Sequence, residues 1–378
     1  MTLSGAPSLD QKLEDSRYRP SGFDYMRLIL AVSVIIGHTA TVAEGEAAGN
    51  AFFNGPLQGY WQMVLPMFFA LSGFLVAGSM VRSQTIVTFL GLRVIRIYPA
   101  LAVEVFLSAF LIGPFVTEVP LSTYFTDHRF WRYLVNVTGH ISYVLPGVFN
   151  HNPKPDIINW QLWTVPWELG CYLALTGLVL VRLKRNRNLI FAGILLVAAL
   201  SIAKSIFSHA NLLAPLVGHV WGPDLILYFL CGVGAYLFRE TIPWSPAVGV
   251  ASIVVTVLLL KFSPLGQYLS LASMTYTTVF LGLCNPRRSA ILVLADGSYG
   301  IYLYGYAIQQ FVAWAFPWSR VWYLNGLVAL PLSILFGLAS WFVVEKPAMK
   351  LRDKLKTLES WWLTRRAVFG RPIGLWQP

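Results

Sequence analysis

The sequence has few charged residues, and fewer still that are acidic. Of its 378 residues only 12% are Asp, Glu, Lys or Arg, whereas 56% are hydrophobic. A soluble protein carries about twice that share of charge, so the composition excludes a soluble globular core and favours a polytopic membrane protein. The 28 lysines and arginines outnumber the 17 acidic residues. They stand in short clusters between apolar runs, as cytoplasmic loops do, so we expect no nucleic-acid partner.

Cysteine is scarce as well, and its placement excludes two further classes of protein. Cys171, Cys231 and Cys284 all lie inside apolar runs, where cysteine behaves as a small buried hydrophobic residue. The sequence holds no Cys-x-x-Cys and no His-Glu-x-x-His motif, so we expect neither a disulfide framework nor a metal site. The residues before Phe23 include no apolar stretch, which predicts that no cleavable signal peptide is present.

Long apolar runs make up most of the chain. A run of about 17 to 25 such residues is long enough to cross the ~30 Å hydrocarbon layer of a membrane as a helix. We therefore expect an all-α, polytopic transmembrane helix bundle of about ten spans. The predicted spans are 24–43, 60–81, 98–117, 163–181, 189–207, 222–238, 245–261, 267–284, 292–316 and 321–343.

The basic residues predict how this bundle is oriented and divided. A cytoplasmic N-terminus places most of the lysines and arginines, including the run at 182–187, on the cytoplasmic side, and the C-terminus is then cytoplasmic too. We expect an N-terminal segment (1–22), a membrane domain (23–345) and a basic amphipathic tail (346–378) on the membrane lipid. Residues 83–97 are expected to form a short helix at the cytoplasmic face that runs into the third span. The connection 118–160 is expected outside, either covering a cavity or as an ordered lid without chemistry.

The first predicted span carries three ionisable residues. Asp24, Arg27 and His38 fall near one face of a helix, and the rise from Arg27 to His38 is about 16 Å. With Arg27 at the interface, His38 reaches roughly the middle of the hydrocarbon layer. Such a residue is a functional candidate, although a histidine here can also be a packing residue bonded to a neighbouring helix. Apolar surroundings disfavour its charged form, so we expect a neutral His38 that can act as a general base.

Further charged residues stand at or inside other spans, and each has two interpretations. Glu168 lies near the outer part of a span, where a carboxylate is expected to face the protein interior and to pair. Arg93 and Arg96 join Arg27 at the cytoplasmic face, either as a clamp for phosphate or as ordinary positive-inside charges.

Weaker polar signals favour a structural interpretation. Gly297, Ser298 and Tyr299 follow Asp296 at a span, and small residues of this kind are typical of a helix–helix interface. Glu104 and Asp224 indicate pairing between helices rather than chemistry.

Short motifs follow one another in order over nearly the whole chain. They are Phe23-Asp24-x-x-Arg27 with His38 after ten further residues, Phe68-Phe69-Ala70-Leu71-Ser72-Gly73-Phe74-Leu75, Arg93-x-x-Arg96-Ile97-Tyr98-Pro99, Trp163-Thr164-x-x-x-Glu168-x-x-x-Tyr172, Ser298-Tyr299-Gly300-Ile301-Tyr302-Leu303 and Val344-Glu345-Lys346-Pro347. In this order they resemble the motifs of the acyltransferase-3 membrane proteins, bacterial O-acyltransferases that modify cell-envelope glycans. Two positions depart from the family: Leu169 stands where many members have a second acidic residue, and Gly305 where a histidine is often found.

The resemblance implies a reaction and its partners. The donor would be an acyl-coenzyme A, most often acetyl-CoA, used as a substrate rather than as a permanently bound cofactor. The acceptor would be a hydroxyl of a saccharide or lipid-linked saccharide, at the bacterial cytoplasmic (inner) membrane. A homodimer is left open.

The resemblance also implies roles for single residues. His38 would be the catalytic base, and Glu168 would either orient it or bind the acceptor. Arg27, Arg93 and Arg96 would hold the phosphates of coenzyme A. The supporting positions of these motifs are Asp24, Ser72, Trp163, Tyr172, Ser298 and Tyr299.

Other functions fit parts of the pattern. Buried charges in about ten spans also describe a transporter, or a flippase for a lipid-linked saccharide. Many carriers have two similar halves, and the second half of this sequence has no counterpart of Asp24, Arg27 and His38. A glycosyltransferase with acids in its first external loop is a third option, but Glu44 and Glu46 have no supporting motif.

Overall fold

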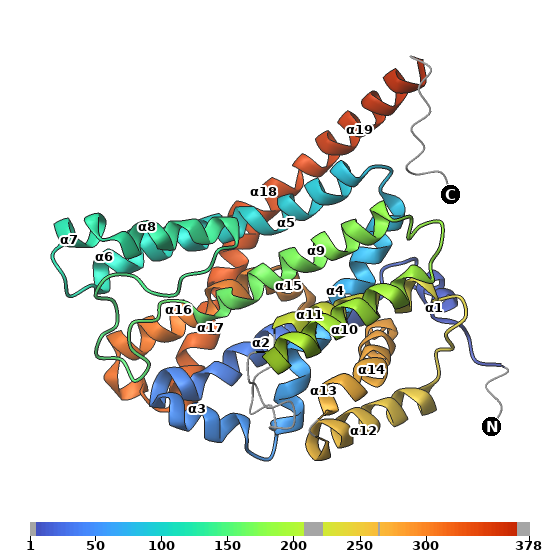
Figure 1. Cartoon of the computed structure of the whole chain (residues 1–378). Coiled ribbons are helices and arrows are strands. Elements are labelled where there is room, and N and C mark those ends of the chain that lie inside the picture. The colour runs from blue at the N-terminus through green and yellow to red at the C-terminus, as the bar shows by residue number, and fades with distance from the viewer. Residues whose placement is uncertain (1–4, 208–221, 264, 369–378) are drawn as a thin grey trace. The chain divides into compact units, whose positions relative to one another are not determined.

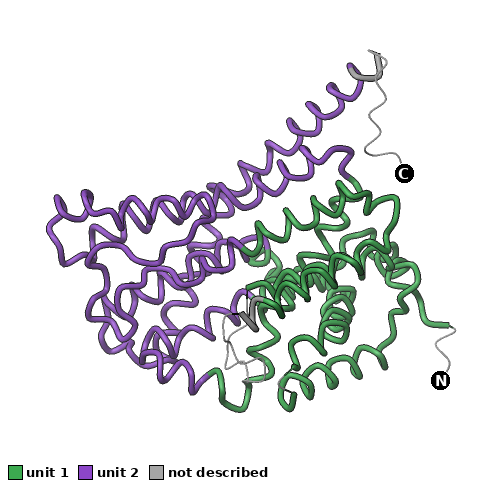
Figure 2. The backbone as a smooth tube through the Cα atoms, in the orientation of Figure 1, with its two compact units in different colours: residues 1–30, 53–82, 167–295 green, residues 31–52, 83–166, 296–378 purple. Residues whose placement is uncertain are grey.

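A computed structural model describes residues 5–207, 222–263 and 265–368 of the chain, and every regular element in these ranges is a helix (Figure 1). The chain divides into two compact units (Figure 2). Unit 1 holds residues 1–30, 53–82 and 167–295, and unit 2 holds residues 31–52, 83–166 and 296–378. Each unit is described separately below.

Unit 1 contains the helices that come from the first and middle parts of the sequence. They are α1 (Leu9–Asp15), the first part of α2 (Ser21–Glu44), α4 (Gln58–Arg82), most of α9 (Val165–Leu180), α10 (Leu189–Phe207), α11 (Gly222–Leu237), α12 (Pro246–Phe262), α13 (Gly266–Leu269), α14 (Leu271–Leu283) and α15 (Leu292–Asp296).

Helices α4 and α11 approach each other most closely in this unit, at two glycines. A Cβ atom on Gly73 would lie 1.9 Å from the carbonyl oxygen of Phe229, and one on Gly232 would lie 2.0 Å from that of Ala70. No side chain fits at either position, because real Cβ atoms do not approach an oxygen so closely. The motif that contains Gly73 therefore serves packing between helices.

Unit 2 is built from the end of α2, a group of short helices, and the last third of the chain. Its elements are α3 (Glu46–Phe53), α5 (Ile86–Leu107), η1 (Ser108–Ile112), α6 (Gly113–Val116), α7 (Leu121–Thr126), α8 (His128–Leu134), η2 (Val135–Thr138), η3 (Trp160–Thr164), α16 (Ser298–Ala315), η4 (Pro317–Ser319), α17 (Trp322–Ser340), η5 (Trp341–Glu345), α18 (Lys346–Met349) and α19 (Leu351–Val368). Helices α16 and α17 lie side by side (Figure 1).

A helix lies within each of the ten predicted spans. Four helical stretches in the described part of the chain have the length and hydropathy to cross a membrane, namely 21–44, 58–82, 86–116 and 322–365. The helices at 189–203, 222–237, 246–262 and 271–283 are apolar but shorter. The all-helical prediction is confirmed for the described residues, while the count of about ten spans and the cytoplasmic position of both termini stay predictions.

The helix expected over residues 83–97 is the first part of α5, which begins at Ile86 and runs through Pro99 into the predicted third span without a break. Proline removes one N–H from the helix, which a membrane helix tolerates when neighbours satisfy the freed carbonyl. The span predicted at 292–316 is interrupted at Gly297, which separates α15 from α16.

Both ends of the chain contain helices. Within 1–22 the short helix α1 begins at a capping box, in which the Ser8 and Gln11 side chains bond to each other's backbone N–H. The predicted tail helix is present as α19, and residues 369–378 lie outside the described residues. One residue of its apolar side contacts α5, because the Leu355 side chain packs over Gly91, whereas Leu358 and Trp362 are exposed. Thr85 donates a hydrogen bond of 2.8 Å to Glu359.

Candidate active site

Helix α2 runs unbroken from Ser21 to Glu44 and carries the three ionisable residues that the sequence singled out. Asp24 and Arg27 form an ion pair one helical turn apart, in unit 1. A guanidinium nitrogen of Arg288 lies 3.8 Å from the other oxygen of Asp24. Asp24 therefore contacts two arginines, and its effect on the site passes through them.

His38 lies in the part of α2 that belongs to unit 2, where it packs against α16. Its ring meets the ring of Tyr306 edge to face, with centroids 5.3 Å apart and an angle of 79°. One turn earlier, the carbonyl oxygen of Ile35 accepts a hydrogen bond of 2.8 Å from the Gln309 side chain. A Cβ on Gly305 would lie 2.7 Å from Ile35 Cγ1, so glycine allows α16 to approach α2 at this turn. Backbone and side chains of α16 thus fix the turn that carries His38.

A buried hydrogen-bond network lies behind this contact and begins at Glu104 of α5. One oxygen of Glu104 accepts from the Asn159 amide at 2.7 Å and from the Ser108 hydroxyl at 2.8 Å. Asn159 also donates to the carbonyl of Leu303 at 2.8 Å, and its side-chain oxygen accepts from the backbone N–H of Gln161 at the start of η3. The interpretation of Glu104 as an interhelical partner is confirmed, since its partners Ser108, in η1, and Asn159, the cap of η3, lie outside α5.

The short helix η3 connects this network to α16. The side-chain oxygen of Gln161 accepts from the backbone N–H of Tyr306 at 3.1 Å, and the hydroxyls of Thr164 and Tyr302 are 2.7 Å apart. Two separate motifs therefore meet in unit 2: the one that begins at Trp163, a partly buried residue of η3, and the one that begins at Ser298.

A second cluster in unit 2 joins residues from three motifs. Arg96 pairs with the buried carboxylate of Glu345 at 3.1 Å, and its guanidinium lies over the rings of Tyr299 and Trp341, at 5.6 and 5.9 Å from their centroids. Tyr299 donates to the carbonyl of Ile97 at 3.3 Å. The contact with Glu345 uses one terminal nitrogen of Arg96, and a guanidinium has five N–H donors, so Arg96 has both a structural partner and capacity for an anion.

The remaining predicted site residues are placed as follows. Arg93 lies in α5, with its guanidinium 5.8 Å from the centroid of the Phe89 ring. In unit 1, Glu168 of α9 accepts a hydrogen bond of 2.7 Å from Tyr172, and Ser72 is partly buried in α4.

Ser298 is buried at the start of α16, where a Cβ on Gly297 would lie 3.1 Å from the backbone of Gly337. Small residues at this point do serve a helix–helix interface. Asp224 pairs with Ser201 across α10 and α11 at 2.7 Å.

The sequence reasoning missed the polar residues that surround His38. Gln161, Tyr306, Gln309 and Asn325 are buried and uncharged, so they do not stand out as intramembrane charges do. A signal was present, since Gln309 and Gln310 follow each other inside a predicted apolar span, and buried amides need partners.

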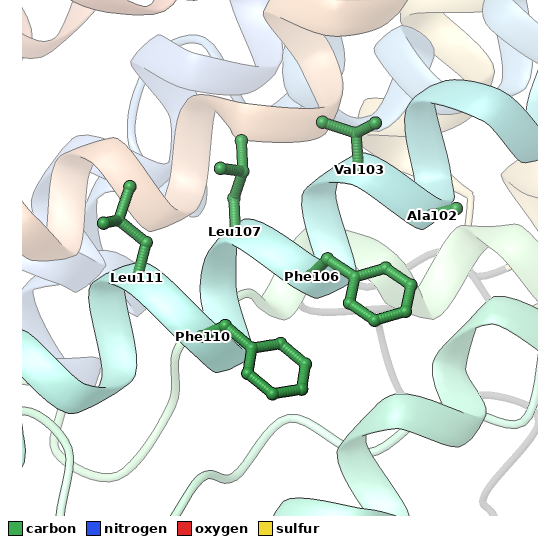
Figure 3. Close-up of a pocket in the computed structure, with 6 residues that line it drawn as sticks. All are labelled: Ala102, Val103, Phe106, Leu107, Phe110 and Leu111. Carbon is green, nitrogen blue, oxygen red and sulfur yellow. The ribbon is translucent and has the colours of Figure 1, made fainter.

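A groove in unit 2 is lined by apolar side chains alone. It has a volume of about 620 Å³, lies on α5 and η1, and is lined by Ala102, Val103, Phe106, Leu107, Phe110 and Leu111 (Figure 3). All of these side chains are apolar, and Phe106 and Leu111 are more than half exposed, as on the lipid-facing side of a span. Within the described residues, no cluster of His, Cys, Asp or Glu is suited to a metal ion.

Comparison with known proteins shows the family. The family described as "Acyltransferase domain" matches residues 21–346. An O-acetyl transferase of Shigella phage Sf6 is 25% identical over 347 residues, which cover 87% of this chain and 96% of the relative. Nodulation protein 10 of Rhizobium leguminosarum bv. viciae is 27% identical over an alignment of 383 positions, covering 90% of this chain and 96% of the relative. No solved structure matches the chain.

The match covers both units and all the motifs from Phe23 to Glu345. Together with the four long apolar helices, it makes this protein a multi-pass membrane protein with an acyltransferase role, and the chain belongs to the acyltransferase-3 family.

Proposed function

We propose that the protein moves an acyl group, in the first instance acetyl, from acyl-coenzyme A to a hydroxyl of a cell-envelope or exported saccharide at the bacterial inner membrane. The acyltransferase family match supports the type of reaction, and the printed name of one relative, O-acetyl transferase, supports acetyl transfer to oxygen. Lipid-linked saccharide is included among the acceptors.

The observation that carries the proposal is the position of His38. It lies in unit 2 against Tyr306 and next to a turn bonded by Gln309. A histidine in its neutral form can accept a proton, and these contacts hold the ring at a fixed place.

The proposed step follows from this state. His38 removes the proton from the acceptor hydroxyl while that oxygen attacks the thioester carbonyl of acyl-CoA. A carbon–oxygen bond forms, the carbon–sulfur bond breaks, and the proton held by His38 passes to the sulfur of coenzyme A. The histidine returns to its neutral form, so no permanently bound cofactor is needed.

Arg93 and Arg96 are proposed to bind the phosphates of the donor. Both belong to α5 in unit 2, and Arg96 is held by Glu345 and two aromatic rings, which leaves its planar donors oriented. Arg27 and Glu168 belong to unit 1, and their roles as phosphate contact and as partner of His38 or acceptor stay predictions.

The test is single-substitution kinetics on the purified full-length protein in lipid nanodiscs. Labelled acetyl-CoA is the donor, and the de-acetylated cell-envelope polysaccharide of a strain deleted for the gene is the acceptor probe. His38→Ala is expected to lower turnover by about 100-fold or more, whereas His151→Ala, at an exposed histidine outside the predicted spans, leaves it unchanged. Unimpaired turnover in a folded His38→Ala protein overturns the proposal. Transport of the saccharide without release of coenzyme A would favour the transporter instead.

A further inference from the structure

On η3, α16 and α17 of unit 2, four buried side chains each have one polar atom without a hydrogen-bond partner among the described residues, as Oε2 of Glu104 on α5 also does. The four atoms are Nε2 of Gln161, the hydroxyl of Tyr306, Oε1 of Gln309 and Oδ1 of Asn325. All four residues are at most 1% exposed. Most buried polar groups in proteins are paired, and each exception requires an explanation. Four exceptions in one region indicate a place built for a ligand.

Two of the four residues contact the turn of α2 that carries His38, and the other two are bonded to those two. The ring of Tyr306 contacts the ring of His38, and the Gln161 side chain accepts from the Tyr306 backbone. Gln309 donates to the carbonyl of Ile35, one turn before His38, and Asn325 donates to the carbonyl of Gln309.

In each amide group one atom already makes a hydrogen bond, and the partner in that bond shows whether the remaining free atom is the nitrogen or the oxygen. Gln161 faces a backbone N–H, so the atom in that contact is its oxygen and the free atom is the nitrogen. Gln309 and Asn325 face backbone carbonyls, so their nitrogens are engaged and their oxygens are free. The free atoms are thus one N–H₂ donor, two acceptors, and a hydroxyl that can do both.

This set of atoms decides which ligand chemistry fits. A phosphate, a carboxylate or a thioester carbonyl only accepts hydrogen bonds and would leave both amide oxygens unpaired, which is costly in a buried site. A sugar hydroxyl donates and accepts at once, and neighbouring hydroxyls of one ring can pair with several of these atoms together.

Aromatic side chains next to this region fit the same ligand. Tyr306 packs in a buried cluster with Val42 and Ile157, and the partly buried rings of Tyr143 and Trp160 pack against that cluster. These two rings are stacked, with centroids 5.1 Å apart. Apolar and aromatic walls with a few fixed polar groups are typical of small-molecule sites.

We propose that Gln161, Tyr306, Gln309 and Asn325 form the subsite that binds hydroxyl groups of the saccharide acceptor beside His38. This inference rests on the proposed function and deepens it, because it assigns four residues to the acceptor rather than to acyl-CoA. The unpaired hydroxyl of Tyr306, whose ring contacts the His38 ring, is the group expected to touch the acceptor most directly.

Tyr306→Phe is the sharpest test, because it keeps the ring that contacts His38 and removes only a hydroxyl that has no partner in the described structure. Loss of an unpaired buried hydroxyl is expected to leave the thermal midpoint unchanged or to raise it. The KM for the de-acetylated envelope polysaccharide is expected to rise about 5- to 10-fold, which corresponds to one lost neutral hydrogen bond. The KM for acetyl-CoA should not change.

Tyr304→Phe is the matched control on the same helix. The hydroxyl of Tyr304 lies 3.2 Å from Ser340 and donates to Ala100, so its removal is expected to lower the thermal midpoint and to leave both KM values unchanged. An acceptor KM in Tyr306→Phe within about twofold of the wild-type value, or an equal rise in the KM for acetyl-CoA, overturns the subsite.

A second variant covers the amides. Asn325→Leu removes the free oxygen together with the bond to Gln309, and the acceptor KM is expected to rise at least as far as in Tyr306→Phe. Failure of the two proposals is distinguishable. Turnover that survives His38→Ala overturns the proposed function. If the wild-type protein transfers label and the acceptor KM of Tyr306→Phe equals that of the wild type, only the subsite is overturned.

Discussion

His38 and Tyr306 lie edge to face with ring centroids 5.3 Å apart, and Tyr306 is itself bonded through its backbone to Gln161. Gln161 lies in the first turn of η3, whose cap residue Asn159 bonds to the buried carboxylate of Glu104. The position of the His38 ring therefore depends on residues distributed from α5 to α16, and a change at one end of this network is expected to reach the other.

Asn159→Ala tests that dependence. It removes two donated hydrogen bonds and the cap of η3, so we expect the free energy of unfolding to fall by about 2–3 kcal/mol. The turnover number should fall because His38 loses its support, and the KM for the acceptor should rise because Gln161 and Tyr306 lose theirs, while the KM for acetyl-CoA stays the same. Thermal unfolding and steady-state kinetics measure the two effects. Asn188→Ala, at an exposed residue, should change neither, and an Asn159→Ala protein with wild-type turnover would show that the network is not needed.

Arg93→Ala tests the contact with the donor. A charge-assisted hydrogen bond to phosphate contributes about 1.5–3 kcal/mol, so we expect the KM for acetyl-CoA to rise by about tenfold or more while the KM for the saccharide stays the same. The control is Arg182→Ala, at an exposed arginine of the 182–187 cluster. Equal donor KM values in the two variants would assign Arg93 to the ordinary positive-inside charges.

The pair formed by Arg96 and Glu345 predicts a non-additive effect on stability. Glu345 is 2% exposed and Arg96 is 27% exposed, so Arg96→Leu leaves a buried carboxylate without its cation. We expect a loss of about 2–3 kcal/mol, toward the low end for a buried pair because Arg96 is partly solvated. The double variant Arg96→Leu with Glu345→Leu should recover part of that loss. Chemical denaturation of the four proteins of the cycle measures it, and strict additivity would mean that the pair contributes nothing.

Gly73→Ala tests the contact between α4 and α11. Its Cβ would lie 1.9 Å from the carbonyl oxygen of Phe229, so the helices must separate, and we expect a large drop in the yield of monodisperse protein on gel filtration. Gly177→Ala in α9 is the matched control, because no atom lies within 4 Å of its added Cβ. That variant should be slightly more stable than wild type, by up to about 1 kcal/mol. Comparable yields of the two variants would contradict the packing role of Gly73.

The parts of this structure that follow from local pattern could be predicted from the sequence. Apolar runs indicate where the helices lie, and the Asp24 and Arg27 pair follows from their spacing of three residues. The ends of α5 and α16 were harder to predict, because neighbouring helices decide whether Pro99 or Gly297 interrupts a helix. The partners of Arg96 and the amides around His38 come together only through tertiary contacts, such as the one between Arg96 and Glu345, 249 residues apart. A single sequence contains no periodic signal for such pairs.

The contact between α5 and α19 has a consequence for how the protein is made. Thr85 and Glu359 are separated by 274 residues, and Leu355, which packs over Gly91, is synthesised after nearly all of the membrane domain. During translation the first turns of α5 must therefore remain without this partner until α19 leaves the ribosome. A chain that terminates before Leu355 would present this uncovered face of α5 to the cell's quality-control proteases.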